Sequence, residues 1–179
     1  MKHLKNKRIA VFGSGRAVEN SPNWKLAFRA GKLLAESGFT VVNGGYRGVM
    51  EASAKGARSA GGHVIGVTAE IFKSARNSFI DTEIRTSNLP DRLSKLIEVS
   101  DGFILLDGGT GTLAELVTVW EMLSKGFFEK PAAVLGVYMK QVVRFVSRLP
   151  EVSVPPTLKP FSDPRRAIQF LQRSINSPE

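Results

Sequence analysis

The sequence predicts a three-layer α/β domain, in which a mostly parallel sheet carries helices on both faces. Short apolar runs of strand length alternate with amphipathic segments of helix length along the chain. Glycine-rich turns follow three of the apolar runs, at points where a strand would lead into a helix. The 179 residues, 42% of them hydrophobic, suit a single folded core, and neither a repeat nor a long linker divides residues 1–179.

Periodicity and capping residues define the individual elements. Apolar runs predict strands over residues 8–12, 39–43, 63–68, 103–107 and 132–137. Apolar residues at helical spacing predict helices over residues 24–37, 49–60, 91–100, 112–125, 139–148 and 163–174. Gly38 ends the first helix, Pro90 begins the third, and Asp163 with Pro164 begins the last.

Two segments have a weaker pattern. Residues 69–88 mix charges with isolated apolar residues, which predicts a loop with a short edge strand near residues 80–85. Residues 150–160 are rich in proline and are predicted to connect two elements without regular structure. Because parallel crossovers are right-handed, few topologies remain, and the alternation as a whole describes a Rossmann-like domain.

Composition narrows the classes of function. The net charge of +9 favours anionic ligands, although the 25 Lys and Arg residues are scattered and equally fit a solvated basic surface. The absence of cysteine excludes disulfides and thiolate metal sites, and it fits an intracellular, cytoplasmic location. No apolar run approaches the roughly 18 residues of a membrane span. The basic residues 1–7 precede an apolar run that is too short for a signal sequence.

The three glycine-rich turns are expected to meet, because parallel strands all end at one edge of the sheet, where ligands bind. Glycine permits positive φ and a close approach of backbone to ligand, but it also serves purely structural turns. None of the turns has P-loop or GxGxxG spacing. The turns contain these candidate binding residues: Gly13, Ser14, Gly44, Gly45, Gly108, Gly109, Thr110, Gly111 and Thr112.

The third turn, residues 107–112, is the most informative feature of the chain. Bare N–H groups at the start of the helix that follows it can hold a phosphate. Glu115 is expected one turn into that helix. Arg92 lies on the preceding helix, which should begin near the same edge and so aim Arg92 at the same pocket. Two other interpretations stay open, a surface ion pair of Arg92 with Asp91 or Glu98, and a helix-dipole role for Glu115.

The turns resemble the motifs of the LOG family, also described as possible lysine decarboxylases. The residues that match the motif PGGxGTxxE are Gly108, Gly109, Gly111, Thr112 and Glu115, with Asp107 in place of the proline. The residues that match GGGxxGLM are Gly44, Gly45, Gly48 and Met50, with Asn43 and Val49 as departures. Arg92 takes the place of the catalytic arginine of the cytokinin-activating members, but Leu93 and Leu96 replace the lysine and methionine after it. The resemblance covers about residues 7–137.

The resemblance implies a phosphoribohydrolase that cleaves the N-glycosidic bond of a nucleoside 5′-monophosphate, such as AMP or a cytokinin ribotide. The products would be a free base and ribose 5-phosphate. The third turn would hold the phosphate, and Glu115 would stabilise an oxocarbenium-like sugar or orient the attacking water. Arg92 would act electrostatically, since an arginine stays protonated. No metal or cofactor is required, and His3 and His63 are far apart in the sequence.

The resemblance also implies a homodimer or a larger homo-oligomer. Residues 113–125, with Val117 and Trp120, and the pair Phe127-Phe128 are a candidate apolar interface, or equally ordinary core. The sequence does not support the older description as a lysine decarboxylase, because nothing in it indicates a cofactor-binding lysine.

Two other functions stay open. Molybdenum-cofactor carrier proteins resemble this chain as a related branch, and a carrier of a phosphorylated pterin or nucleotide would not need both Arg92 and Glu115. Asp107 bears on this choice, because an ionised carboxylate would repel phosphate unless its side chain caps the turn or points away. Nucleic-acid binding would fit the net charge, but the 8% aromatic content and the lack of a basic–aromatic stripe argue against it.

Overall fold

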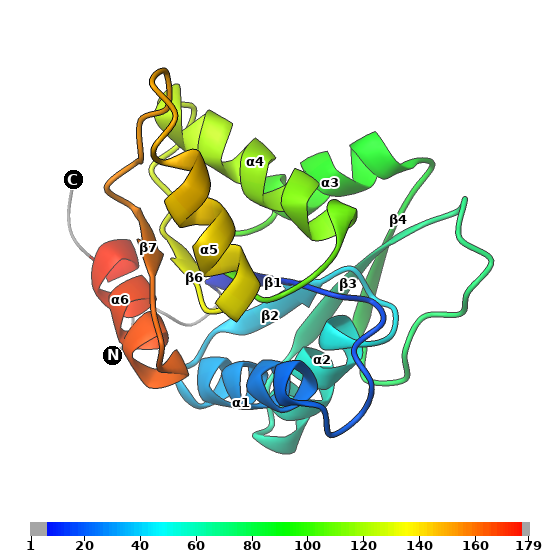
Figure 1. The fold of residues 1–179 in the computed structure, drawn as a ribbon. Helices are drawn as coiled ribbons and strands as arrows, with labels where there is room; N and C mark the ends of the chain where they lie inside the picture. Colours follow the sequence, from blue (N-terminus) through cyan, green and yellow to red (C-terminus); the bar gives the residue numbers. More distant parts are fainter. Residues whose placement is uncertain (1–6, 177–179) are drawn as a thin grey trace.

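The structure, a computed structural model, describes residues 7–176 and contains a seven-stranded parallel sheet (Figure 1). The strands are β1 (Arg8–Phe12), β2 (Thr40–Asn43), β3 (Val64–Ala69), β4 (Thr82–Thr86), β5 (Gly102–Leu105), β6 (Ala132–Val134) and β7 (Leu158–Pro160). The helices are α1 (Pro22–Glu36), α2 (Val49–Ser59), α3 (Leu89–Glu98), α4 (Thr110–Ser124), α5 (Val137–Val146) and α6 (Pro164–Asn176). The predicted α/β class is confirmed.

The strand order is β4-β3-β2-β1-β5-β6-β7. The chain therefore builds outward from β1 in one direction, then returns and builds outward in the other. Every paired strand is parallel, so all the C-terminal ends lie at one edge. The order reverses between β1 and β5, which is where open α/β sheets bind ligands.

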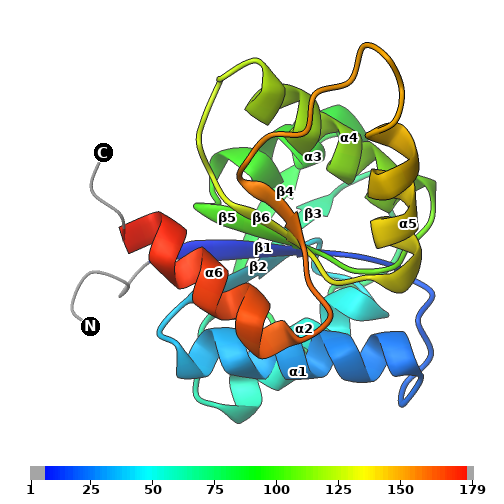
Figure 2. The same cartoon turned by 60° about the vertical axis from the view of Figure 1, so that its left-hand side comes forward.

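Helices cover both faces of the sheet and make two separate cores. Helices α1, α2 and α6 lie on one face, and α3, α4 and α5 lie on the other (Figure 1, Figure 2). Successive residues of β1 serve opposite cores, because side chains alternate along a strand. Ile9 and Val11 enter the first core, while Ala10 and Phe12 enter the second. This burial on both sides explains why β1 is an uninterrupted apolar run.

The predicted edge strand near residues 80–85 is confirmed as β4. The prediction that residues 150–160 lack regular structure is wrong at their C-terminal end. Residues 158–160 form β7, which pairs with β6 at the sheet edge. An edge strand tolerates proline because its outer N–H groups need no partner in the sheet. Leu158 anchors β7 in the second core.

Four of the predicted boundaries also change. Helix α1 begins at Pro22, since Ser21 accepts a hydrogen bond from the Trp24 N–H, and α4 begins at Thr110. The strand predicted over residues 132–137 ends at Val134, and α5 begins at Val137. Within the described residues, no helix is long and apolar enough to cross a membrane.

Candidate functional site

The turns after β1 and β5 meet at the point where the strand order reverses and line a cavity of about 690 Å³. The Ser14 N–H donates to the Asp107 carbonyl at 2.9 Å, which ties the first turn to the third. The Val49 N–H donates to the Ser14 carbonyl at 2.8 Å, which ties the first turn to the second. The cavity brings together these predicted residues: Gly13, Ser14, Arg92, Gly109, Thr110, Gly111, Thr112 and Glu115.

The N-terminus of α4 opens directly into this cavity. Its N-cap residue is Gly109, no side chain caps it, and its first turn contains no acidic residue. A Cβ atom built on Gly109 or Gly111 would meet nothing within 4 Å, so packing does not require glycine at either position. The two glycines instead leave space above the helix N–H groups, which is the geometry that accepts an anion.

Glu115 extends from α4 into the same cavity and is half-buried. Within residues 7–176 its carboxylate receives no hydrogen bond. Burial disfavours the charged form and raises the pKa of Glu115 to about 8, while the charge of Arg92 acts in the opposite direction. A carboxyl group whose pKa lies near neutrality is suited to proton transfer or to switching on a charge during a reaction.

Arg92 is held rigidly on the opposite wall. Its Nε donates to the Val67 carbonyl at 2.8 Å, and its Nη2 donates to the Gly44 carbonyl at 3.0 Å. The rings of Tyr46 and Phe72 lie 5.5 and 5.8 Å from the guanidinium carbon. Burial lowers the pKa of Arg92, and the charge of Glu115 raises it.

The interpretation of Arg92 as a surface ion pair is wrong. Asp91 accepts hydrogen bonds from Ser87 and Asn88, and Glu98 pairs with Lys95 at 2.6 Å. Helix α3 begins after β4, so its first turn lies at the C-terminal edge of the sheet and directs Arg92 inward. This is the placement expected from the sequence.

Asp107 points away from the N-terminus of α4. Its carboxylate accepts hydrogen bonds from the N–H groups of Val137, Tyr138 and Met139 at 2.9, 2.7 and 3.0 Å. It therefore caps the N-terminus of α5, whose own N-cap, Gly136, makes no side-chain cap. The charge that could repel a phosphate is held on the neighbouring helix.

Three predicted binding residues lie behind the cavity wall and shape it. A Cβ on Gly44 would overlap the Arg92 guanidinium, so this glycine makes room for the arginine. Gly45 has a φ of +79°, and its N–H donates to the Asn43 side chain at 2.8 Å. A Cβ on Gly108 would overlap Thr112.

Arg16, Met50 and Phe72 line the cavity but were not among the predicted site residues. The sequence signal that could have identified Arg16 as a site residue is its position in the chain, directly after the first glycine-rich turn. Within residues 7–176, its guanidinium makes no ion pair or hydrogen bond. Phe72 lies in the loop after β3, where no periodic pattern marks it.

The remaining predictions concern metals and assembly. The described residues contain no group of three His, Cys, Asp or Glu side chains that could hold a metal ion. His63 hydrogen-bonds to Thr82 at 3.0 Å, and His3 lies outside the described residues. Trp120 is buried core, while Val117 and Phe127 are exposed, and the homo-oligomer stays a prediction.

Comparison with family models gives a match to the SLOG cluster4 family over residues 6–146. The chain belongs to this family. A protein of Archaeoglobus fulgidus described as uncharacterized is 40% identical over 113 residues, which are 63% of this chain and 73% of that protein.

Two further relatives of this SLOG family protein carry functional names. A probable cytokinin riboside 5′-monophosphate phosphoribohydrolase of Oryza sativa subsp. japonica is 31% identical over 147 residues. The match covers 79% of this chain but 65% of the rice protein, which is just under two thirds of its length. The solved structure of the molybdenum cofactor binding protein from Rippkaea orientalis superposes with a TM-score of 0.78 at 25% identity. That match covers 97% of this chain and 99% of the other.

Proposed function

We propose that this SLOG family protein hydrolyses the N-glycosidic bond of a nucleoside 5′-monophosphate, either AMP or a cytokinin ribotide. One observation carries the proposal: an uncapped helix N-terminus, a carboxylate that receives no hydrogen bond within the described residues and a fixed guanidinium surround the same cavity. The named rice relative supports the same reaction class.

The 5′-phosphate would bind at the N-terminus of α4, where residues 109–112 present their N–H groups to the cavity. The positive end of the helix dipole favours an anion there. Arg16, which has no ion-pair partner within residues 7–176, would add a positive charge beside the same turn.

The reaction breaks the bond between C1′ of the ribose and the base nitrogen, and a water oxygen bonds to C1′. The electron pair of the broken bond leaves with the base. One proton of the water is lost and the base nitrogen gains one, so the products are free base and ribose 5-phosphate. Glu115 in its ionised form would stabilise the positive charge that develops on the sugar, or accept the proton from water.

Arg92 would position the nucleotide and stabilise negative charge on the departing base. Its Nε and Nη2 groups are occupied by two backbone carbonyls, which fixes the plane of the guanidinium. Within the described part of the chain, its Nη1 group makes no hydrogen bond and remains available to a substrate. A preorganised charge of this kind stabilises a transition state without having to reorient.

The test is to incubate the protein with AMP and with N6-isopentenyladenosine 5′-monophosphate and to quantify free base and ribose 5-phosphate. Glu115→Gln should lower base release by roughly 10²- to 10⁴-fold, the usual contribution of a positioned acid or base. Glu121→Gln is the matched control, because Glu121 lies on the same helix but is exposed. Equal rates for wild type and Glu115→Gln would refute the assignment of Glu115.

The second candidate is a carrier that binds a nucleotide or the molybdenum cofactor without turnover. The match to the Rippkaea orientalis protein over nearly the whole of both chains favours it. A carrier predicts saturable binding with no release of base or ribose 5-phosphate, and Glu115→Gln would then leave binding unchanged. The same incubation, followed by calorimetric titration, separates the two functions.

A further inference from the structure

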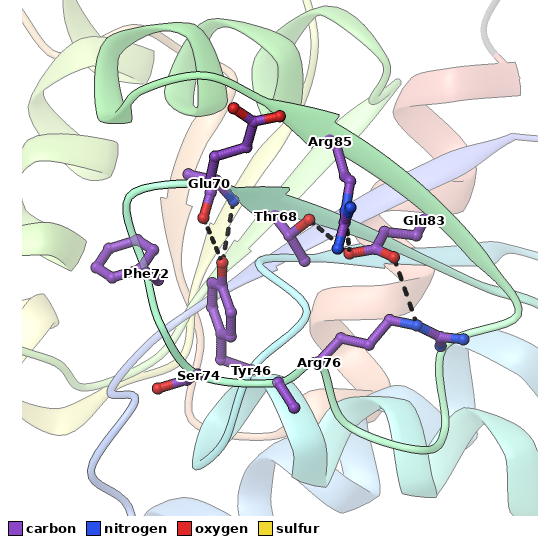
Figure 3. A pocket seen from close by; sticks show the side chains of 10 residues that line it. Tyr46, Thr68, Glu70, Phe72, Ser74, Arg76, Glu83 and Arg85 are labelled. Atoms are coloured by element: carbon purple, nitrogen blue, oxygen red, sulfur yellow. Dashed lines mark hydrogen bonds and ion pairs between the residues drawn. The ribbon is translucent and has the colours of Figure 1, made fainter.

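A second cavity, of about 460 Å³, lies at the C-terminal ends of β3 and β4, under the loop of residues 70–81 that joins them (Figure 3). Phe72 lines this cavity and also the larger one that contains Arg92 and Glu115. Its ring is therefore a wall common to both spaces. The two cavities are therefore neighbours that share this residue.

Tyr46 supports this wall. Its ring meets Phe72 edge-on at a centroid distance of 5.2 Å, and its hydroxyl hydrogen-bonds with both the N–H and the carbonyl of Ala69 at 3.0 Å. In Figure 3, Tyr46 lies between Phe72 and the charged side chains of the second cavity. The guanidinium of Arg92 contacts both rings from the side of the larger cavity.

Hydrogen bonds of Asn77, five residues after Phe72, anchor the loop that carries Phe72. The backbone N–H of Asn77 donates to the Gly45 carbonyl at 2.8 Å, and its side-chain amide donates to the Tyr46 carbonyl at 2.8 Å. Asn77 is buried, whereas residues 70–76 are exposed. Phe72, with 40% of its surface exposed, presents its ring where a ligand can reach it.

The far wall of the second cavity is polar. Glu83 accepts a hydrogen bond from the Thr68 hydroxyl at 2.7 Å and forms ion pairs with Arg76 and Arg85, each at 3.5 Å (Figure 3). Two arginines and one glutamate supply both donors and an acceptor. An apolar chain inserted here would separate these groups from water without replacing their hydrogen bonds, which costs free energy.

We propose that Phe72 is the stacking platform for the base of the nucleotide, and that the second cavity reads the exocyclic edge of that base. The preferred substrates are then nucleotides such as AMP, whose base carries only hydrogen-bonding groups at its exocyclic edge. Nucleotides whose base carries an apolar chain at N6 are expected to be poorer substrates. This inference deepens the proposed function and rests on it for the identity of the substrate. Because Phe72 lines both cavities, the edge of a base stacked on its ring would be directed past Tyr46 toward the cavity that contains Glu83 and its arginines.

The stacking role is tested by binding, in a Glu115→Gln background that prevents turnover. Phe72→Ala should weaken AMP binding by about tenfold or more, the scale of one base–aromatic stack, and leave the affinity for ribose 5-phosphate within about twofold. Ile71→Ala is the matched control, because Ile71 is the exposed neighbour and lines neither cavity. An unchanged affinity for AMP, or an equal loss for ribose 5-phosphate, would overturn this role.

The reading of the base edge is tested by kcat/KM for AMP against N6-isopentenyladenosine 5′-monophosphate. We expect wild type to prefer AMP by about tenfold or more, since the apolar chain would shield Glu83 and its arginines from water without replacing their hydrogen bonds to water. Glu83→Leu should reduce this preference, while Lys73→Leu, on the same loop but outside the cavity, should not. A preference for the isopentenyl substrate would overturn the inference and leave the proposed function standing. Hydrolysis of neither nucleotide would refute the proposed function, and the binding experiment would still decide the role of Phe72.

Discussion

Helices α4 and α5 begin side by side, but their N-termini differ in how they are capped. They follow the adjacent strands β5 and β6, and each has a glycine N-cap that makes no side-chain hydrogen bond. At α5 the Asp107 carboxylate supplies the missing acceptor, and a Cβ on Gly136 would overlap it. At α4 no side chain of residues 7–176 supplies one, and a Cβ on Gly109 would enter open space. One helix end is capped by a side chain of the protein, and the other is the end where we propose that the phosphate binds.

The same contrast separates the two carboxylates beside the third turn. Asp107 accepts three backbone N–H groups, whereas Glu115 receives no hydrogen bond within residues 7–176. Burial without donors raises the pKa of Glu115 to about 8. Asp107 caps α5, and Glu115 is the carboxylate that we propose takes part in the reaction.

Closing the open helix end should give the largest effect. Gly109 has the extended backbone (φ −89°, ψ −154°) of an N-cap, so Gly109→Asp fits without strain and makes α4 resemble α5. We expect the free energy of unfolding to rise by about 1 kcal/mol. We expect the affinity for ribose 5-phosphate to fall by about 10²-fold, because the new carboxylate occupies the N–H groups and repels the phosphate. Calorimetric titration and urea unfolding measure the two effects.

Gly109→Asn is the matched control, since it caps the helix without adding charge. It should match the aspartate variant in stability and fall between it and wild type in affinity. Ribose 5-phosphate binding that survives Gly109→Asp unchanged would mean that the anion binds elsewhere.

Opening the closed helix end should give a smaller effect, on stability. Asp107→Ala removes the acceptor for three N–H groups of α5, and we expect a loss of about 2 kcal/mol in the free energy of unfolding. Affinity for ribose 5-phosphate should stay within about twofold of wild type, because the carboxylate points away from α4. Asp163→Ala is the comparison, since Asp163 is half-buried, accepts one backbone N–H at 3.2 Å and makes an ion pair with Arg29 at 3.6 Å. A variant with wild-type stability and lost phosphate binding would reverse the assignment.

Much of the fold was predictable from sequence, because burial on both faces makes parallel strands continuous apolar runs. The predicted convergence of Arg92 and Glu115 also follows from topology, since α3 and α4 both begin at the C-terminal edge of the sheet. Strand β7 was not predictable in the same way. Its prolines suggest irregular structure, and only its place at the edge, beside β6, permits them.

The role of Asp107 could not be read from the sequence, where the conflict with phosphate is visible but its resolution is not. The three N–H groups that bind Asp107 belong to residues 137–139, which become its neighbours only when β5 pairs with β6. Phe72 was missed for a similar reason. Its loop has no periodicity, and the contacts that fix it come from Tyr46, which is distant in the sequence, packs against Phe72 and accepts a hydrogen bond from Asn77.

The pH dependence of activity should show the smallest effect and distinguish the two carboxylates directly. If the ionised form of Glu115 acts on the sugar, kcat/KM for AMP should rise by about tenfold between pH 7 and pH 9, as a group of pKa about 8 loses its proton. Asp107→Asn should keep this ascending limb, because the limb belongs to Glu115. A profile that falls over the same range would assign Glu115 the role of a general acid toward the departing base.

The free energy of unfolding should change with pH in the direction opposite to that of kcat/KM. Because burial raises the pKa of Glu115 in the folded state, folded protein binds more protons than unfolded protein between about pH 4.5 and pH 8. The contribution of Glu115 to the free energy of unfolding is therefore fully present below about pH 4.5. It is lost as the pH rises through 8. Glu115→Gln should raise the melting temperature more at pH 8.5 than at pH 5, where the carboxyl is neutral in the folded state. A gain that is equal at both values would mean that Glu115 is not held in the unfavourable environment from which its proposed reactivity derives.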